Sequence, residues 1–196
     1  MERKIIRVAF VLVVVLAGFA LGFIVFGDKK DGALSATEQK AQIQRDRELF
    51  VDWYEDYKHN LEQLDFCWQQ YHRIRRDYLS EEIDGETAAE RLKTLRQKQV
   101  LIIEDIHREI PPQTLTPKFY EKVVPLYKKL TLYSTAQGNA VASSLALLNE
   151  ENLERFEDAE LARKLEETAV AESPAALFTA GDIAAVRSHL ELPGEK

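Results

Sequence analysis

Residues 50–78 read FVDWYEDYKHNLEQLDFCWQQYHRIRRDY, and this stretch decides the fold. Its apolar and aromatic side chains recur at alternating steps of four and three residues, at Phe50, Tyr54, Tyr57, Leu61, Leu64, Trp68 and Tyr71. This heptad spacing predicts an α-helix with one apolar seam that packs on other helices. Arg75 interrupts the seam and Tyr78 resumes it, and Asp84-Gly85 is typical of the turn that should follow.

Three more helical segments follow the turn. Residues 86–109 carry an apolar stripe at Leu92, Leu95, Gln99, Ile102 and Ile106. Residues 100–103 are apolar on every side, which indicates burial on more than one face. Thr116-Pro117 predicts the start of a third helix over residues 117–148, because proline is favoured at the first helical position. Residues 150–171 fit an acidic fourth helix, either separate from the third or continuous with it.

The segments have comparable lengths and short connections, which makes neighbouring helices antiparallel. With 8 Gly and 6 Pro in 196 residues, the chain lacks the many turns of an all-β domain. The sequence therefore predicts an all-α protein whose residues 50–171 form an antiparallel bundle of three or four helices. Residues 172–196 are predicted to be an Ala-rich linker, a short helix beginning at Asp182, and a tail.

An apolar block precedes the bundle. Residues 8–26 read VAFVLVVVLAGFALGFIVF, of which fourteen are Val, Leu, Ile or Phe and five are Ala or Gly. As a helix the block would be about 28 Å long, enough to cross the hydrocarbon core of a bilayer. It is predicted to be a signal-anchor transmembrane helix in contact with the lipid bilayer. Cleavage after Ala20-Leu21-Gly22 is the alternative, although it would leave four apolar residues at the new N-terminus.

Basic residues set the expected orientation of the anchor. Residues 1–7 contain three basic side chains and only residues 29 and 30 are basic directly after the block, so the tail 1–7 is predicted to be cytoplasmic. The domain after the block would then be extracytoplasmic, in a single-pass membrane protein of the cell envelope. Residues 27–49 are predicted to be a juxtamembrane hinge and a polar helical stalk that begins with a Ser35–Glu38 capping box.

Charge and cysteine content exclude several classes of function. The net charge is −7, and because residues 1–7 contribute +2 and the apolar block none, the remainder carries −9. Such a domain would repel phosphate backbones, so no nucleic-acid partner is expected. Cys67 is the single cysteine, so no disulfide can form within the chain. It is expected to be a small buried residue, with an intermolecular disulfide as the alternative.

Two groups of side chains in residues 50–78 are candidates for an interaction surface. Trp53 and Phe66 do not fit the heptad seam and should be exposed or face another helix. Arg73, Arg75 and Arg76 form a basic cluster that could bind anionic lipid or an acidic partner. The plain structural explanation of the cluster is that cations are favoured near a helix C-terminus.

The best chemical lead is Glu104-x-x-His107, which has the spacing of di-iron helical bundles. A second pair and further inward-facing Glu residues are missing, so no metal site, cofactor or catalytic residue is predicted. Phosphate-binding loops, nucleophile elbows and zinc motifs are also absent from the sequence.

The expected function is that of a membrane-anchored interaction module, not an enzyme. Such a module would dock a protein partner or a second copy of itself as a scaffold, adaptor or assembly factor. The alternative is a ligand-binding sensor bundle that works with a separate signalling partner. A cavity bordered by Tyr54, Tyr57 or Tyr71 would favour that alternative.

Overall fold

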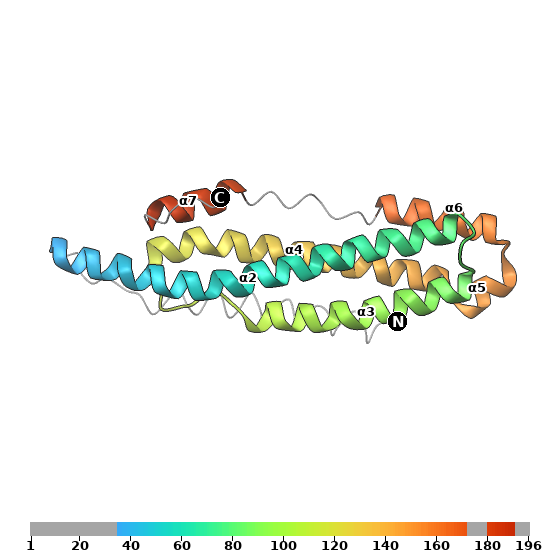
Figure 1. The fold of residues 1–196 in the computed structure, drawn as a ribbon, viewed down its shortest axis with the longest axis horizontal. Helices are drawn as coiled ribbons and strands as arrows, with labels where there is room; N and C mark the ends of the chain where they lie inside the picture. Colours follow the sequence, from blue (N-terminus) through green and yellow to red (C-terminus); the bar gives the residue numbers. More distant parts are fainter. Residues whose placement is uncertain (1–34, 172–179, 191–196) are drawn as a thin grey trace, which may run out of the picture. The chain divides into compact units, whose positions relative to one another are not determined.

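The computed structural model describes residues 35–171 and 180–190, and these residues form helices, turns and bends without a β-strand. The all-α prediction is therefore confirmed for this part of the chain. The helices are α2 (Ala36–Leu79), α3 (Gly85–Arg108), α4 (Pro117–Leu147), α5 (Glu150–Arg155), α6 (Asp158–Ala171) and α7 (Ala180–His189) (Figure 1).

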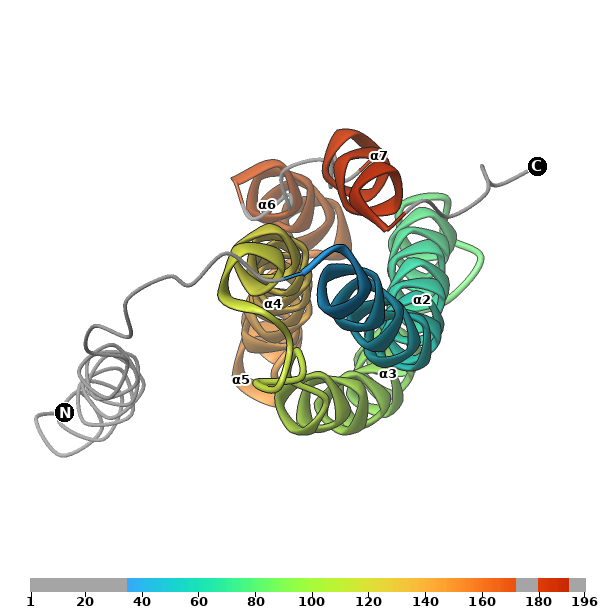
Figure 2. The ribbon, with the colours of Figure 1, turned by 90° about the vertical axis from the view of Figure 1, so that its left-hand side faces the viewer.

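The three long helices α2, α3 and α4 lie side by side and alternate in direction (Figures 1 and 2). Hydrogen bonds join Asp46 to Thr116 near the start of α4 and Tyr71 to Ser144 near its end, so α2 and α4 run parallel. The intervening α3 runs the opposite way, because its first turns lie near the end of α2 and its last residues lie near Trp53. This is the up-and-down order that short connections favour.

The fourth side of the bundle is shared by two short helices. Both α6 and α7 pack against α4 (Figure 2). The Tyr78 hydroxyl of α2 donates a hydrogen bond to Asp158 at the start of α6 (3.2 Å), and Lys129 of α4 forms an ion pair with Asp182 of α7. The side chains that α6 and α7 bury are Leu161, Leu165, Val186 and Leu190, the last just after α7.

The chain after α4 decides between the two predicted alternatives and differs from the prediction at one further point. Asn149 is the N-cap of α5, where its side chain accepts a hydrogen bond from the Asn152 N–H (2.8 Å), so the chain breaks from α4 at this point. A second break near Phe156 separates α5 from α6, so the predicted single helix over residues 150–171 is two helices. The predicted short last helix is present as α7, and it packs into the bundle.

The residues predicted to be buried on α3 are buried, whereas on α2 some of the buried residues lie one position before the predicted ones. All five residues of the α3 stripe are buried, whereas Val100 and Leu101 are 39% and 61% exposed, so the prediction that residues 100–103 are buried on several sides is wrong. On α2, Leu61 and Trp68 are only half-buried. Asn60 and Cys67, each one position earlier, are buried in their place, and Ile74 is buried next to Arg75, where the predicted seam is interrupted.

Polar side chains are buried at several heptad positions. The Ser144 Oγ donates to the Ala140 carbonyl (2.9 Å), so its single proton is used and the Tyr71 hydroxyl donates to Ser144 (2.9 Å). Asn60 Nδ2 donates to the Glu109 side chain (2.6 Å). The remaining buried polar residues of α3 and α4 are Gln99, Ser134 and Gln137. These groups make the seam between the long helices partly polar.

The start of α2 tests the predicted stalk. The Ser35–Glu38 capping box is present, because the Ser35 N–H donates to Glu38 Oε2 (2.8 Å) and the Glu38 N–H donates to Ser35 Oγ (3.3 Å). The Ser35 hydroxyl also donates to Glu38 Oε2 (2.7 Å), and the two hydrogen bonds that this carboxylate accepts from Ser35 lower the pKa of Glu38. The stalk ends earlier than predicted, since Asp46 is buried against Thr116 and Leu49 packs on the core.

Within residues 35–171 and 180–190, no helix has both the length and the apolar character that crossing a bilayer requires. The predicted transmembrane helix, residues 8–26, lies outside the described residues.

The turn from α2 to α3 contains a non-glycine residue in the left-handed region. Glu81 has φ 60°, and its N–H donates to the Tyr78 carbonyl (3.1 Å) while the Glu82 N–H donates to the Asp77 carbonyl (2.9 Å). This pair of hydrogen bonds is the Schellman motif, whose left-handed position usually holds glycine.

Replacing Glu81 by glycine should raise the free energy of unfolding by up to about 1 kcal/mol. Relief of the left-handed backbone gains about 1–2 kcal/mol, and the greater unfolded-state entropy of glycine cancels part of it. Urea denaturation followed by circular dichroism measures the change. The control is Glu82→Gly, which should be destabilising because φ at this residue is not positive. Equal shifts for both variants would contradict the explanation.

Candidate functional site

The five residues predicted to form an interaction surface fall into three environments. Trp53 is 6% exposed and belongs to the core, so its assignment to an exposed surface is wrong. Phe66 is 48% exposed, as the prediction requires. Arg73 and Arg76 are exposed and Arg75 is half-buried.

Trp53 faces the end of α3. Its indole Nε1–H donates to the Glu109 carbonyl (2.9 Å), one residue after the last residue of α3. Because Asn60 also donates to the Glu109 side chain, two α2 residues hold this end of α3 in place. Burial and the nearby Asp56 carboxylate are the main causes that raise the pKa of Glu109. Trp53 therefore positions the helices and does not face a partner.

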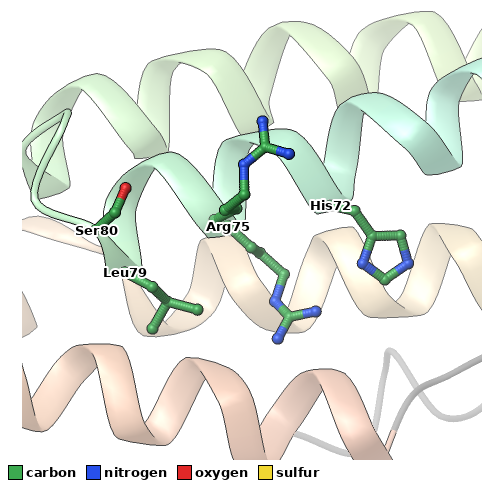
Figure 3. Close-up of a pocket in the computed structure, with 5 residues that line it drawn as sticks. His72, Arg75, Leu79 and Ser80 are labelled. Atoms are coloured by element: carbon green, nitrogen blue, oxygen red, sulfur yellow. The ribbon is translucent and has the colours of Figure 1, made fainter.

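One concave feature is a wide-open hollow on the C-terminal part of α2, with a volume of about 350 Å³. We call it the basic hollow. Its described lining residues are His72, Arg75, Arg76, Leu79 and Ser80. Spacings of three, four, seven and eight residues place these side chains on one face of the helix. Figure 3 shows His72 and Leu79 projecting from the same side of α2.

Aromatic side chains support the cationic side of the basic hollow. The Arg75 guanidinium lies over the Tyr71 ring, 5.5 Å from its centroid. The His72 ring makes an edge contact with Trp68, with ring centroids 4.6 Å apart. Burial and then the positive charge of Arg75 lower the pKa of His72. At neutral pH this favours the uncharged imidazole, which can still donate one hydrogen bond.

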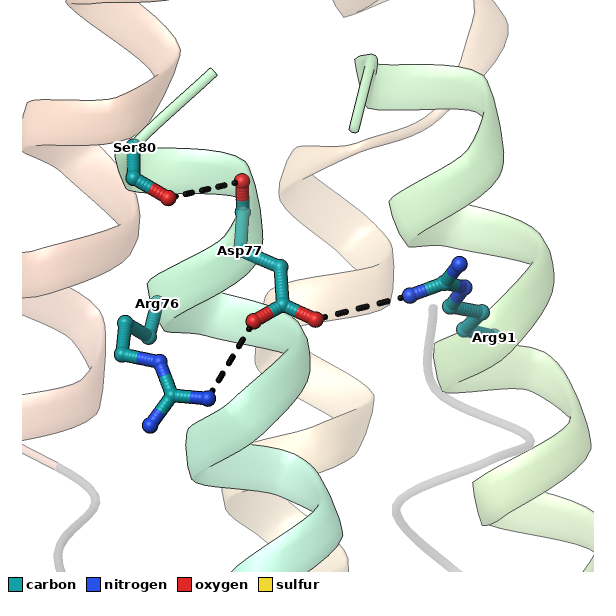
Figure 4. Close-up of polar contacts among 4 residues, drawn as sticks. All are labelled: Arg76, Asp77, Ser80 and Arg91. Carbon is teal, nitrogen blue, oxygen red and sulfur yellow. Dashed lines mark hydrogen bonds and ion pairs between the residues drawn. The ribbon is translucent and has the colours of Figure 1, made fainter. Parts of the chain in front are cut away.

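Asp77 lies beside the basic hollow and partly neutralises it. Its carboxylate pairs with Arg76 at 3.4 Å and with Arg91 of α3 at 3.5 Å, and its carbonyl accepts a hydrogen bond from the Ser80 hydroxyl at 3.3 Å (Figure 4). The three contacts are long and the Arg76 side chain is 73% exposed, so each contributes at most about 1 kcal/mol. Arg75 makes no ion pair with any residue of the described chain.

The end of α2 has two opposing effects on an anion. Negative charge near a helix C-terminus costs about 0.3–1 kcal/mol, whereas a hydrogen bond to a charged group contributes about 1.5–3 kcal/mol. The carbonyls of Arg76, Asp77 and Tyr78 also accept the N–H groups of the turn, which reduces the unfavourable field. The unfavourable field of the helix end is therefore small compared with a hydrogen bond from one guanidinium group to an anion.

A second feature is an exposed apolar surface on α2 and α3, formed by Phe66, Lys98 and Leu101, which we call the α2/α3 face. The Lys98 ammonium lies 4.3 Å from the centroid of the Phe66 ring. Leu101 follows Lys98 by three residues and so shares its side of α3. Phe66 is 48% exposed and Leu101 is 61% exposed.

The other candidate residues are either buried in the core or exposed to solvent without gathering into a site. Cys67 is fully buried, which confirms the expected small core residue, and burial raises the pKa of its thiol. Glu104 and His107 are both exposed, and no three His, Cys, Asp or Glu side chains gather at one point in residues 35–171 and 180–190. Tyr54, Tyr57 and Tyr71 are buried in the core, and none of them lines the basic hollow.

Sequence reasoning identified Arg75 and Arg76 but not His72 or Ser80. The missing signal was helical spacing, since His72 precedes Arg75 by three residues and Ser80 follows Arg76 by four. Lys98 was also overlooked as part of the exposed face.

Comparison of the chain with protein-family models, with curated proteins and with solved structures finds no match. Function is therefore inferred from the side chains described above.

Proposed function

We propose that the chain is a membrane-anchored, extracytoplasmic helical bundle that works as an interaction module, binding rather than catalysing. Residues 8–26 would hold it in the bilayer with residues 1–7 in the cytoplasm. The bundle would dock an envelope protein or a second copy of the chain, as a scaffold, adaptor or assembly factor.

The α2/α3 face is the observation that carries this proposal. Single exposed apolar side chains are normal on a soluble domain, but apolar groups gathered on one surface favour a partner. Phe66 and Leu101 are 48% and 61% exposed, the Lys98 ammonium lies over the Phe66 ring, and Leu101 is one turn beyond Lys98 on α3. Aromatic side chains such as Phe66 are enriched at the centre of protein interfaces, and Lys98 would then lie at the rim of this one.

Site-specific crosslinking in intact membranes tests the docking role. A photo-crosslinking amino acid in place of Leu101 should give one dominant adduct, which mass spectrometry identifies as another protein or as the same chain. Leu101→Glu should weaken that association at least tenfold and leave the unfolding midpoint nearly unchanged, because the side chain is exposed. Leu132→Glu is the control, since Leu132 is 70% exposed on α4. Failure to find an adduct, or equal effects of the two substitutions, would refute docking through this face.

The anchor has its own test. A protease added outside intact cells, with any outer membrane opened, should remove a tag placed at Lys196. A protected tag would refute the extracytoplasmic placement.

A ligand-binding sensor bundle is the second candidate. The basic hollow is not bordered by Tyr54, Tyr57 or Tyr71, so this candidate is supported only by the hollow and its cationic side chains. Such a sensor would need a signalling partner in another chain.

A further inference from the structure

Four of the residues that line the basic hollow carry hydrogen-bond donors. Arg75 and Arg76 each carry a guanidinium fork, His72 supplies an imidazole, and Ser80 supplies a hydroxyl. None of the described lining residues is acidic, although the Asp77 carboxylate lies beside them, 3.4 Å from Arg76. The remainder of the chain after residue 26 is strongly acidic, so this grouping is unlike the rest of the domain.

The hydrogen-bond donors of the basic hollow make only long contacts, or none, with other residues of the described chain. Ser80 donates to the Asp77 carbonyl at 3.3 Å, and Arg76 meets the Asp77 carboxylate at 3.4 Å, both near the limit for such contacts. Arg75 is held over the Tyr71 ring, and its Nε has no hydrogen-bond partner among the described residues. An arriving anion would therefore displace few good contacts.

We propose that the basic hollow binds a phosphate group, carried either by a small soluble phosphate ester or by a phospholipid headgroup. A phosphate presents three or more acceptor oxygens to several donors at once, which a single carboxylate does not. The volume of about 350 Å³ is at the lower end for ligand sites, so it suits a phosphate with a short organic group. Leu79 provides an apolar contact for that group. This inference does not depend on docking through the α2/α3 face.

Arg75 and Arg76 would form the principal contacts, as bidentate donors to phosphate oxygens. His72 would add a hydrogen bond, and a bound dianion next to it would raise its pKa from the lowered starting value. Asp77 opposes binding, because its carboxylate lies next to Arg76. Removing that carboxylate should therefore strengthen binding.

The test is titration calorimetry on the full-length chain in a non-ionic detergent, with glycerol 1-phosphate as the soluble probe. Short-chain phosphatidylglycerol below its micelle concentration is the lipid probe. Saturable binding of either probe supports the phosphate site and identifies its source, and binding of both supports the shared chemistry. Binding of neither would overturn the proposal.

Variants separate a specific site from general surface charge. Arg75→Gln and Arg76→Gln should each weaken binding at least tenfold. Arg73 lies two residues before Arg75 and outside the described lining, so Arg73→Gln should change binding less than twofold. Asp77→Asn should tighten binding severalfold, an effect that misfolding cannot imitate. The nuclear magnetic resonance titration of His72 should show a higher pKa with the probe present. Equal weakening by Arg73→Gln, or unchanged binding in Asp77→Asn and Arg76→Gln, would overturn the assignment.

Discussion

Replacing Trp53 by alanine is expected to lower the free energy of unfolding by about 3–5 kcal/mol. The indole is 6% exposed, packs on Phe50 and Tyr57 with ring centroids 6.1 and 5.4 Å away, and donates to the Glu109 carbonyl. Alanine would leave a cavity and would also remove the donor to that carbonyl. The melting temperature of the full-length chain should fall by roughly 6–20 °C in a thermal circular-dichroism scan.

Two control variants distinguish the causes of this loss. Trp53→Phe keeps much of the ring and loses the indole N–H, so its effect should be intermediate. Phe66→Ala removes an aromatic side chain of the same helix that is half exposed, and its cost should be below about 1 kcal/mol. If Trp53→Ala unfolded at the native midpoint, the packing of Trp53 described here would be wrong.

Replacing Asp46 by alanine should cost about 2–4 kcal/mol. The carboxylate is 2% exposed and accepts two hydrogen bonds from Thr116, the N-cap of α4, from the N–H at 3.0 Å and from the hydroxyl at 2.6 Å. Thr116 makes no capping hydrogen bond through its own side chain. Asp46 therefore satisfies the N–H of the N-cap residue from α2, which is the role that the N3 side chain has in a capping box, and its loss leaves that N–H and the Thr116 hydroxyl without their acceptor.

Urea denaturation of matched variants measures the contribution of Asp46. Asp52→Ala removes an exposed carboxylate of the same helix and should change stability by less than about 0.5 kcal/mol. Asp46→Asn keeps one acceptor oxygen and should lose less than Asp46→Ala. Similar results for Asp46→Ala and Asp52→Ala would mean that the contact with Thr116 does not stabilise α4.

Helix positions could be predicted from the sequence because the residues that favour helix starts and turns agree with the spacing of apolar residues. Thr116-Pro117 marks the start of α4, Asp84-Gly85 precedes α3, and the stripe of α3 is buried as predicted. On α2 the prediction had the correct spacing but chose the flanking residues Leu61 and Trp68 over Asn60 and Cys67. A wide apolar stripe permits both choices, and only the packed neighbours decide between them.

Features that depend on contacts between distant residues could not be predicted. Asp46 looks like a surface residue, and its burial follows from Thr116, which lies 70 positions away in the chain. Trp53 was misassigned for the same reason, since its partner is the Glu109 carbonyl. The basic cluster was visible in the sequence, but the hollow beside it depends on how α2 packs.

The buried polar pairs have a consequence for helix register. A seven-residue apolar repeat alone would let α2 slide by one repeat and still bury apolar groups. That shift would separate Tyr71 from Ser144 and Asn60 from Glu109, whose hydrogen bonds join α2 to the other helices. Each buried polar group left without a hydrogen-bond partner would cost roughly 1–3 kcal/mol. A shifted register would therefore lose much of the free energy of unfolding of a typical domain. The buried hydroxyl and amide groups thereby favour one helix register among several that apolar packing alone would allow.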